Sequence, residues 1–160
     1  MAVSDMQHVN EAETKLLSSA LTLFSEKGYE GTSIREIIEG AGVTRPVLYY
    51  YFENKEDLFR RLFETTFSEL VQRIEAGSRL EDSCVVRLKG IISGAFALAE
   101  ENVQAVRLIL QVLFAPPMQG PSLDRDKLIR QRFKTVEYVI RDGLKDKELS
   151  GGDSQSLTLV

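Results

Sequence analysis

The residue types best suited to chemistry lie between Gly28 and Phe59, in the stretch GYEGTSIREIIEGAGVTRPVLYYYFENKEDLF. Two short helical patterns there flank the glycine turn Gly40-Ala41-Gly42, and a run of three tyrosines follows. This is the layout of a helix-turn-helix, in which the second helix enters the major groove of DNA and the first supports it. The stretch therefore predicts contacts with double-stranded DNA.

The rest of the sequence offers no candidate for catalysis. It shows no paired carboxylates in a shared apolar setting, no nucleophile with a suitable base and no glycine-rich phosphate loop. His8 is the only histidine, and the single cysteine, Cys84, excludes an internal disulfide and leaves no zinc cluster. We therefore expect a protein that is not an enzyme and that uses no cofactor or metal.

The composition is that of an ordinary globular protein. Of 160 residues, 43% are hydrophobic and 28% are charged. No run approaches the roughly 18 apolar residues that a membrane span needs, and residues 1–15 lack the basic and apolar regions of a secretory signal. We expect a cytoplasmic protein without a membrane partner.

The charge balance of the N-terminal part opposes a simple electrostatic attraction to DNA. Residues 1–61 hold seven Lys and Arg against ten Asp and Glu, a balance of −3. Affinity for DNA must therefore come from a few well-placed cations and from backbone N–H groups at helix N-termini. The same balance supports an alternative, a helical interaction module that has lost specific DNA binding.

Apolar residues recur at spacings of three and four along most of the chain, which predicts an all-α fold. The first helix is expected to begin at Asn10 and to end at Gly28. Ser33, with Glu36 three residues later, predicts a capping box at the second helix, and Thr44 is the expected cap of the third.

Four further helices are expected after the tyrosines. Asn54 is the predicted cap of a long helix that Gly77 ends, and the others cover about 83–101, 103–113 and 122–147. The proline and glycine residues of 115–121, APPMQGP, predict a loop. Gly151-Gly152 should end the last helix, and Asp153 or Ser154 is then a candidate cap of a new helix. We expect the bundle to be incomplete, and a frayed tail is the alternative.

Three segments in order, GYEGTS, AGVTRPVLYYYF and NKEDLF, resemble the TetR family of bacterial one-component transcriptional regulators. The resemblance covers about residues 10–67. It implies an N-terminal three-helix DNA-binding domain, here 8–54, and a helical bundle for effector binding and dimerisation, here 55–160. It also implies a homodimeric repressor that a small effector releases from a palindromic operator.

The resemblance further implies which side chains meet DNA. Hydroxyls of Thr32 or Ser33 and of Thr44, and the amine of Lys55, would contact phosphates. Arg45 and Val47 would face base edges, and Tyr49 and Tyr51 the backbone or groove wall. Leu48 and Phe52 would enter the domain core. Successive helix positions differ by about 100°, so at least one tyrosine of Tyr49-Tyr50-Tyr51 must be exposed.

The effector is expected to be small and mostly apolar, because few charged residues fall on the inward faces of the bundle helices. Five aromatic side chains are candidates for lining its pocket, and core packing is the alternative for each: Phe63, Phe67, Phe96, Phe114 and Phe133. The helices that build the dimer in such proteins would lie beyond Val160, so the native dimer is expected to need more than these residues.

Overall fold

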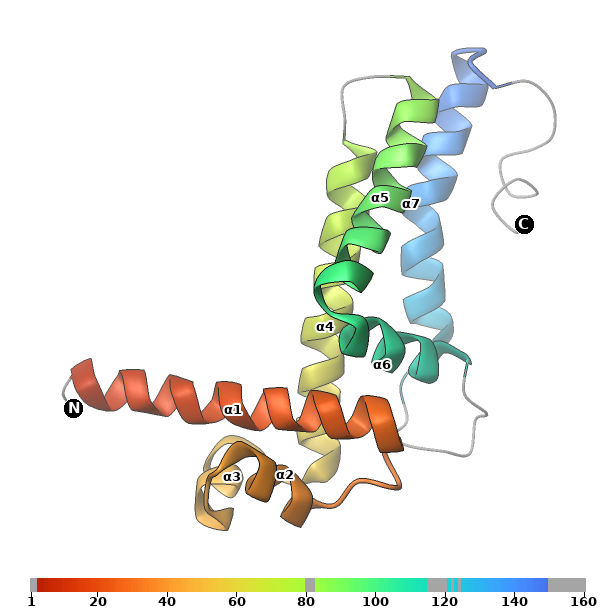
Figure 1. Ribbon diagram of the computed structural model, residues 1–160. Helices are drawn as coiled ribbons and strands as arrows, with labels where there is room; N and C mark the ends of the chain where they lie inside the picture. Colours follow the sequence, from red (N-terminus) through yellow and green to blue (C-terminus); the bar gives the residue numbers. More distant parts are fainter. Residues whose placement is uncertain (1–2, 80–82, 115–120, 122, 124, 150–160) are drawn as a thin grey trace. The chain divides into compact units, whose positions relative to one another are not determined.

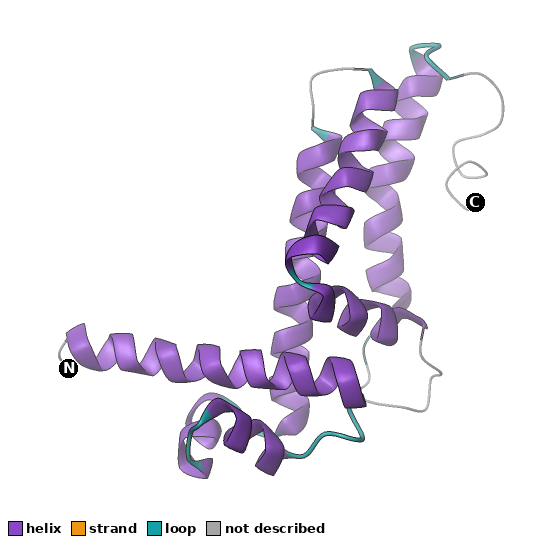
Figure 2. Ribbon diagram, viewed as in Figure 1, coloured by secondary structure: helices purple, strands orange, loops and turns teal. Residues whose placement is uncertain are grey.

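The computed structural model describes residues 3–79, 83–114, 121, 123 and 125–149, with the backbone alone described for 3–10, 125–129 and 131–133. These residues form seven α-helices and no strand (Figures 1 and 2). The prediction of an all-α fold is therefore confirmed. Within the described residues, no helix is both long and apolar enough to cross a membrane.

The chain divides into two compact units. The N-terminal unit comprises Met1–Thr66 and Gln104–Ser122, and the bundle unit comprises Phe67–Val103 and Leu123–Val160. The helices labelled in Figure 1 are α1 (Val3–Lys27), α2 (Ile34–Ala41), α3 (Arg45–Tyr51), α4 (Lys55–Ser78), α5 (Cys84–Glu101), α6 (Val103–Phe114) and α7 (Arg125–Lys145). Helix α4 has residues in both units.

Helix α1 begins at Val3, and the predicted start at Asn10 is wrong. Residues 3–10 contain neither glycine nor proline, so nothing in them breaks the helix, and Asn10 lies inside it rather than at its cap. The predicted end is confirmed. Gly28 follows the last residue with φ +72°, and its N–H donates to the Phe24 carbonyl at 3.0 Å.

The helix-turn-helix forms as its sequence predicts, with one difference. Ser33 and Glu36 make the capping box at the start of α2. The turn needs one left-handed residue, Gly42 at φ +64°, whereas Gly40 and Ala41 still belong to α2. Helix α2 therefore runs two residues into the segment that the sequence assigned to the turn.

The core of the N-terminal unit consists of apolar side chains from all its helices. Helix α1 packs on α2 and α3, and α6 joins through Gln111, whose amide donates to the Ser25 carbonyl at 2.9 Å. The side chains that are almost fully buried include Leu16, Phe24, Ile37, Leu48, Phe52, Leu58 and Leu108. Burial of these side chains is the main stabilising contribution to this unit.

The bundle unit depends on a close approach between α4 and α5. The prediction that Gly77 ends α4 is wrong, because the helix continues to Ser78 and Gly77 is buried within it. A Cβ added at Gly77 would overlap the backbone of Gly90 and Ile91 in α5. Glycine stands there because a second backbone passes too near for a side chain.

Helix α7 ends at Lys145, and the predicted end at Gly151-Gly152 is wrong. Lys147 adopts the left-handed conformation, with φ +61°, and the N–H groups of Glu148 and Leu149 donate to the Gly143 carbonyl. A non-glycine residue thus makes the C-terminal turn. Gly151-Gly152 and residues 115–120 of the predicted loop lie outside the described residues.

Candidate nucleic-acid interface

The loop before α2 is fixed by Lys55, the first residue of α4. Its ammonium donates to the carbonyl oxygens of Tyr29 at 2.9 Å and of Thr32 at 3.0 Å, and lies 4.1 Å from the centre of the Tyr29 ring. The Tyr29 ring in turn packs against Phe24 and Phe59. A lysine ammonium has three N–H donors, so these two bonds leave a third for an external acceptor.

The two hydroxyls that the sequence proposes at the start of α2 differ in position. Thr32 is buried, with 2% of its surface exposed, and its hydroxyl donates to the Gly28 carbonyl at 2.8 Å. Ser33 is exposed and is the N-cap of α2. The Thr32 hydroxyl thus stabilises the loop from inside, and of this pair only Ser33 has a hydroxyl at the surface.

Glu36 connects this start of α2 to the end of α1. Its carboxylate accepts from Lys27 at 2.7 Å and from the Ser33 hydroxyl and backbone N–H at 2.8 and 2.9 Å. The hydrogen bond from Lys27, followed by those from Ser33, lowers the pKa of Glu36 to about 2. The Glu36 carboxylate therefore stays ionised in moderate acid, and its hydrogen bonds hold Ser33 in place.

Helix α3 separates buried from exposed side chains. Leu48 and Phe52 are buried, as predicted, at 0% and 1% exposure. Arg45 is exposed, and Tyr49 is 45% exposed. The Arg45 guanidinium lies over the Tyr49 ring, 5.6 Å from its centre, which orients the arginine without burying it. Thr44 caps α3 without a side-chain hydrogen bond to the helix.

The three tyrosines differ in their exposure. Tyr50 is 68% exposed, more than Tyr49, although only Tyr49 and Tyr51 were expected at DNA. Tyr51 is half-buried and packs edge-on against Tyr50 at 5.0 Å, and burial, then the nearby Tyr50 and Glu13, raises the pKa of its phenol. The 100° step between residues predicts an exposed tyrosine but does not identify which one.

The five aromatic residues proposed for an effector pocket have different surroundings. Phe63 and Phe67 are buried at 1% and 5% exposure, whereas Phe96 and Phe114 are exposed at 67% and 74%. Phe133 belongs to α7, but its side chain lies outside the described residues. None of the five lines the hollow beside Arg79 and Arg87 or the one beside Lys15 and Ser19.

Residues 16–62 match the model of the family described as bacterial regulatory proteins, tetR family. The matched segment contains the second half of α1, all of α2 and α3, and the start of α4. The N-terminal domain of this chain is therefore that of the TetR family. The family resemblance that the sequence motifs suggested is confirmed.

Two curated relatives and one solved structure illustrate the similarity. The negative transcriptional regulator IcaR of the biofilm operon icaADBC from Staphylococcus epidermidis is 39% identical over 57 residues, 36% of this chain and 31% of the relative. The fatty acid metabolism regulator protein of Bacillus subtilis is 29% identical over 138 residues, 86% of this chain and 71% of the relative. The chain spans about a third of the length of the curated relatives matched first.

The solved structure is the transcriptional regulator FadR from Bacillus subtilis in complex with stearoyl-CoA. It has a TM-score of 0.70 and 20% sequence identity, and the match covers 91% of this chain and 78% of that one. At this identity the similarity establishes the fold. The helical arrangement of the chain is thus the one found in TetR-type regulators.

Proposed function

We propose that this chain is a ligand-responsive, DNA-binding transcriptional regulator that represses from a palindromic operator. The observation that carries the proposal is the division of α3 and its C-cap: Leu48 and the cap residue Phe52 are buried, whereas Arg45, Tyr49 and Tyr50 are exposed. A recognition helix needs this division, because one face must hold the domain together while the other enters the groove. Such a regulator acts in the cytoplasm, where bacterial DNA lies.

In the proposed complex, Arg45 reads a base edge and Val47 packs against a thymine methyl group. The hydroxyls of Ser33 and Thr44 and the third N–H of Lys55 contact phosphates, and the tyrosines line the groove wall. We add Tyr50 to this set because its ring is the most exposed aromatic group of the described N-terminal helix-turn-helix.

A palindromic operator requires two copies of the domain related by a two-fold axis. We therefore propose a homodimer whose recognition helices lie about 34–36 Å apart, one turn of DNA. Sedimentation of the chain with and without a palindromic duplex tests this. A complex that always holds one chain per duplex contradicts the dimer.

The effector is proposed to bind in the bundle unit and to have a substantial apolar part. The similarity to a fatty acid metabolism regulator and to a structure that holds stearoyl-CoA supports a fatty acyl compound as a first ligand to test. The chain passes from one unit to the other within α4 and again at the start of α6. A ligand that favours one arrangement of these helices would change DNA affinity by the difference in its affinity for the two states.

A gel shift with the DNA upstream of the chain's own gene tests the proposal. We expect a shift that weakens steeply between 50 and 200 mM salt, a range over which phosphate contacts lose much of their effect. The alternative, an interaction module without DNA binding, draws on the excess of acidic residues in 1–61. It is favoured if specific and random duplexes bind equally weakly at every salt concentration.

A further inference from the structure

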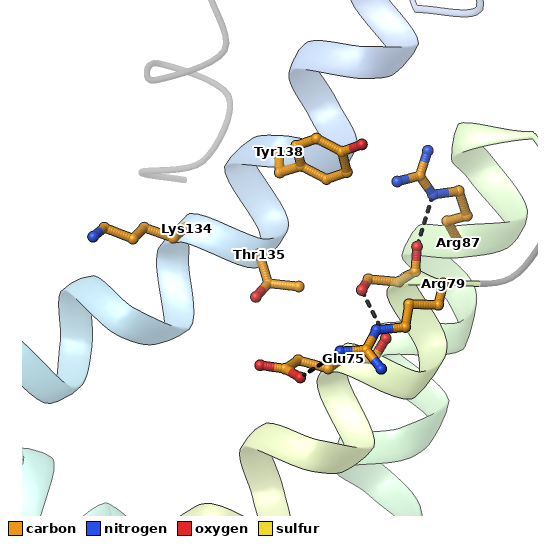
Figure 3. Close-up of a pocket in the computed structure, with 7 residues that line it drawn as sticks. Glu75, Arg79, Arg87, Lys134, Thr135 and Tyr138 are labelled. Atoms are coloured by element: carbon orange, nitrogen blue, oxygen red, sulfur yellow. Dashed lines mark hydrogen bonds and ion pairs between the residues drawn. The ribbon is translucent and has the colours of Figure 1, made fainter.

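The bundle unit contains a hollow of about 500 Å³ that no sequence motif indicated (Figure 3). It lies among the end of α4, the start of α5 and the middle of α7. Its lining includes three basic side chains but one carboxylate, together with hydroxyl groups: Arg79, Arg87, Lys134, Glu75, Thr135 and Tyr138. This volume is within the range typical of small-molecule sites.

Arg87 is held in one position at this hollow. Its Nη1 donates to Asp142 at 2.6 Å, its Nε donates to the Ser78 carbonyl at 2.9 Å, and its guanidinium lies 5.5 Å from the centre of the Tyr138 ring. Only 13% of its side chain is exposed. A guanidinium fixed in this way loses little conformational entropy when a further anion binds.

Arg79 and Lys134 are more available than Arg87. Arg79 pairs with Glu75 at 3.0 Å, but their side chains are 77% and 42% exposed, and exposed pairs of this kind contribute little. A ligand anion can therefore replace Glu75 at small cost. Lys134 is exposed on α7, and since Asp142 already compensates Arg87, the hollow keeps an excess of positive charge.

We propose that this hollow binds the anionic end of a small molecule, a phosphate or carboxylate group, through Arg79, Arg87 and Lys134. Guanidinium groups bind both kinds of anion because two parallel N–H groups can donate hydrogen bonds to two oxygens of a phosphate or a carboxylate. The hollow, at about 500 Å³, has room for more of the ligand than one such group. That this ligand is the effector rests on the proposed function, whereas the binding itself does not.

Calorimetric titration of the full chain with inorganic pyrophosphate, coenzyme A and octanoate tests the proposal. At least one probe should bind with one site per chain. In the double variant Arg79→Gln/Lys134→Gln, affinity should fall about tenfold or more, because two charge-assisted hydrogen bonds are lost. The matched control is Arg141→Gln/Lys145→Gln, which removes the same charge from exposed positions of α7 outside the hollow.

The three probes distinguish a phosphate ligand from a carboxylate ligand. Binding by pyrophosphate or coenzyme A identifies a phosphate ligand, and binding by octanoate alone identifies a carboxylate. The proposal is overturned if no probe binds with a Kd below about 1 mM, or if the control variant weakens binding as much as the double variant does. Both variants change exposed side chains, so thermal unfolding should match the parent.

A gel shift on the same proteins distinguishes this inference from the proposed function. Without an anion, the double variant should bind operator DNA like the parent. With a saturating anion, only the parent should change its DNA affinity. A parent that binds no DNA contradicts the proposed function, but calorimetry still decides whether the hollow is an anion site.

Discussion

The N-terminal unit and the bundle unit use their charged side chains in different ways. In the N-terminal unit most ion pairs join residues four apart on one helix, as in Arg35–Glu39 and Arg60–Glu56. The bundle unit also has local pairs, Arg73–Glu69 and Arg79–Glu75. In addition, Arg87 and Asp142 connect α5 to α7, and Arg73 of α4 pairs with Glu101 at the end of α5. Local pairs support single helices, whereas pairs between helices fix how those helices pack.

The apolar contacts differ as well. Phe24, Tyr29 and Phe59 form an aromatic cluster with ring centres 5.0–5.8 Å apart in the N-terminal unit. In the bundle unit, glycines allow close contacts, Gly77 with the backbone of α5 and Gly143 with the side chain of Cys84. We infer that large side chains determine the stability of the first unit, and close helix contacts that of the second.

The largest expected effect tests the aromatic cluster. Phe24→Ala leaves a cavity at a fully buried position and should lower the free energy of unfolding by about 3–5 kcal/mol. Urea unfolding followed by circular dichroism measures the loss, and hydrogen exchange should locate it in α1–α3. Phe114→Ala is the control, because this side chain is 74% exposed. Equal losses in both variants would contradict the comparison.

A smaller change tests the close approach in the bundle unit. Gly77→Ala gains up to about 1 kcal/mol of helix propensity but places a methyl group against the backbone of α5. Overpacking of this kind costs about 1–3 kcal/mol, and a backbone yields less than a side chain. We expect net destabilisation in thermal unfolding, with Ala76→Ser, at an exposed neighbour, as the control. A stabilised Gly77→Ala protein would mean that α4 and α5 are less close.

Replacement of Arg45 tests the exposed face of α3. Arg45→Ala should reduce affinity for the preferred operator by about 1–3 kcal/mol and relax the base preference at one position. Stability should change little, because Arg45 is exposed. The control, Lys15→Ala, removes the same charge from an exposed site on α1. If the two variants bind every duplex alike, Arg45 does not read a base.

The difference between the units also explains what the sequence could predict. The capping box at Ser33 and the end of α1 at Gly28 depend on neighbours within a few residues, whereas the buried positions of Leu48 and Phe52 were implied by the family resemblance. Local sequence patterns carry that information. The family motifs lie in this same continuous segment, which is why the class of protein could be predicted from the sequence.

Features that depend on contacts between distant segments could not be predicted from the sequence. Gly77 looks like a helix end until α5 is placed against it, and the anion hollow combines residues 75–87 with 134–138. Lys55 was expected at a phosphate, but its partners, the carbonyls of Tyr29 and Thr32, lie more than 20 positions earlier. Periodicity describes one helix at a time and cannot supply these pairings.

The smallest expected effect concerns Glu36, whose carboxylate connects the start of α2 to Lys27 at the end of α1. Because its pKa falls from 4.5 to about 2 on folding, the ionised carboxylate stabilises the folded state above pH 4.5, and this contribution is lost as the pH drops towards 2. The carboxylate is exposed to solvent, so the change should be modest. Carboxyl NMR titration should give a midpoint near 2, and Glu36→Gln should remove this part of the acid dependence of unfolding while Glu39→Gln retains it. A midpoint for Glu36 near 4.5 would show that Lys27 and Ser33 do not hold the carboxylate in solution, and this contact between α1 and α2 would then add nothing to the acid dependence of unfolding.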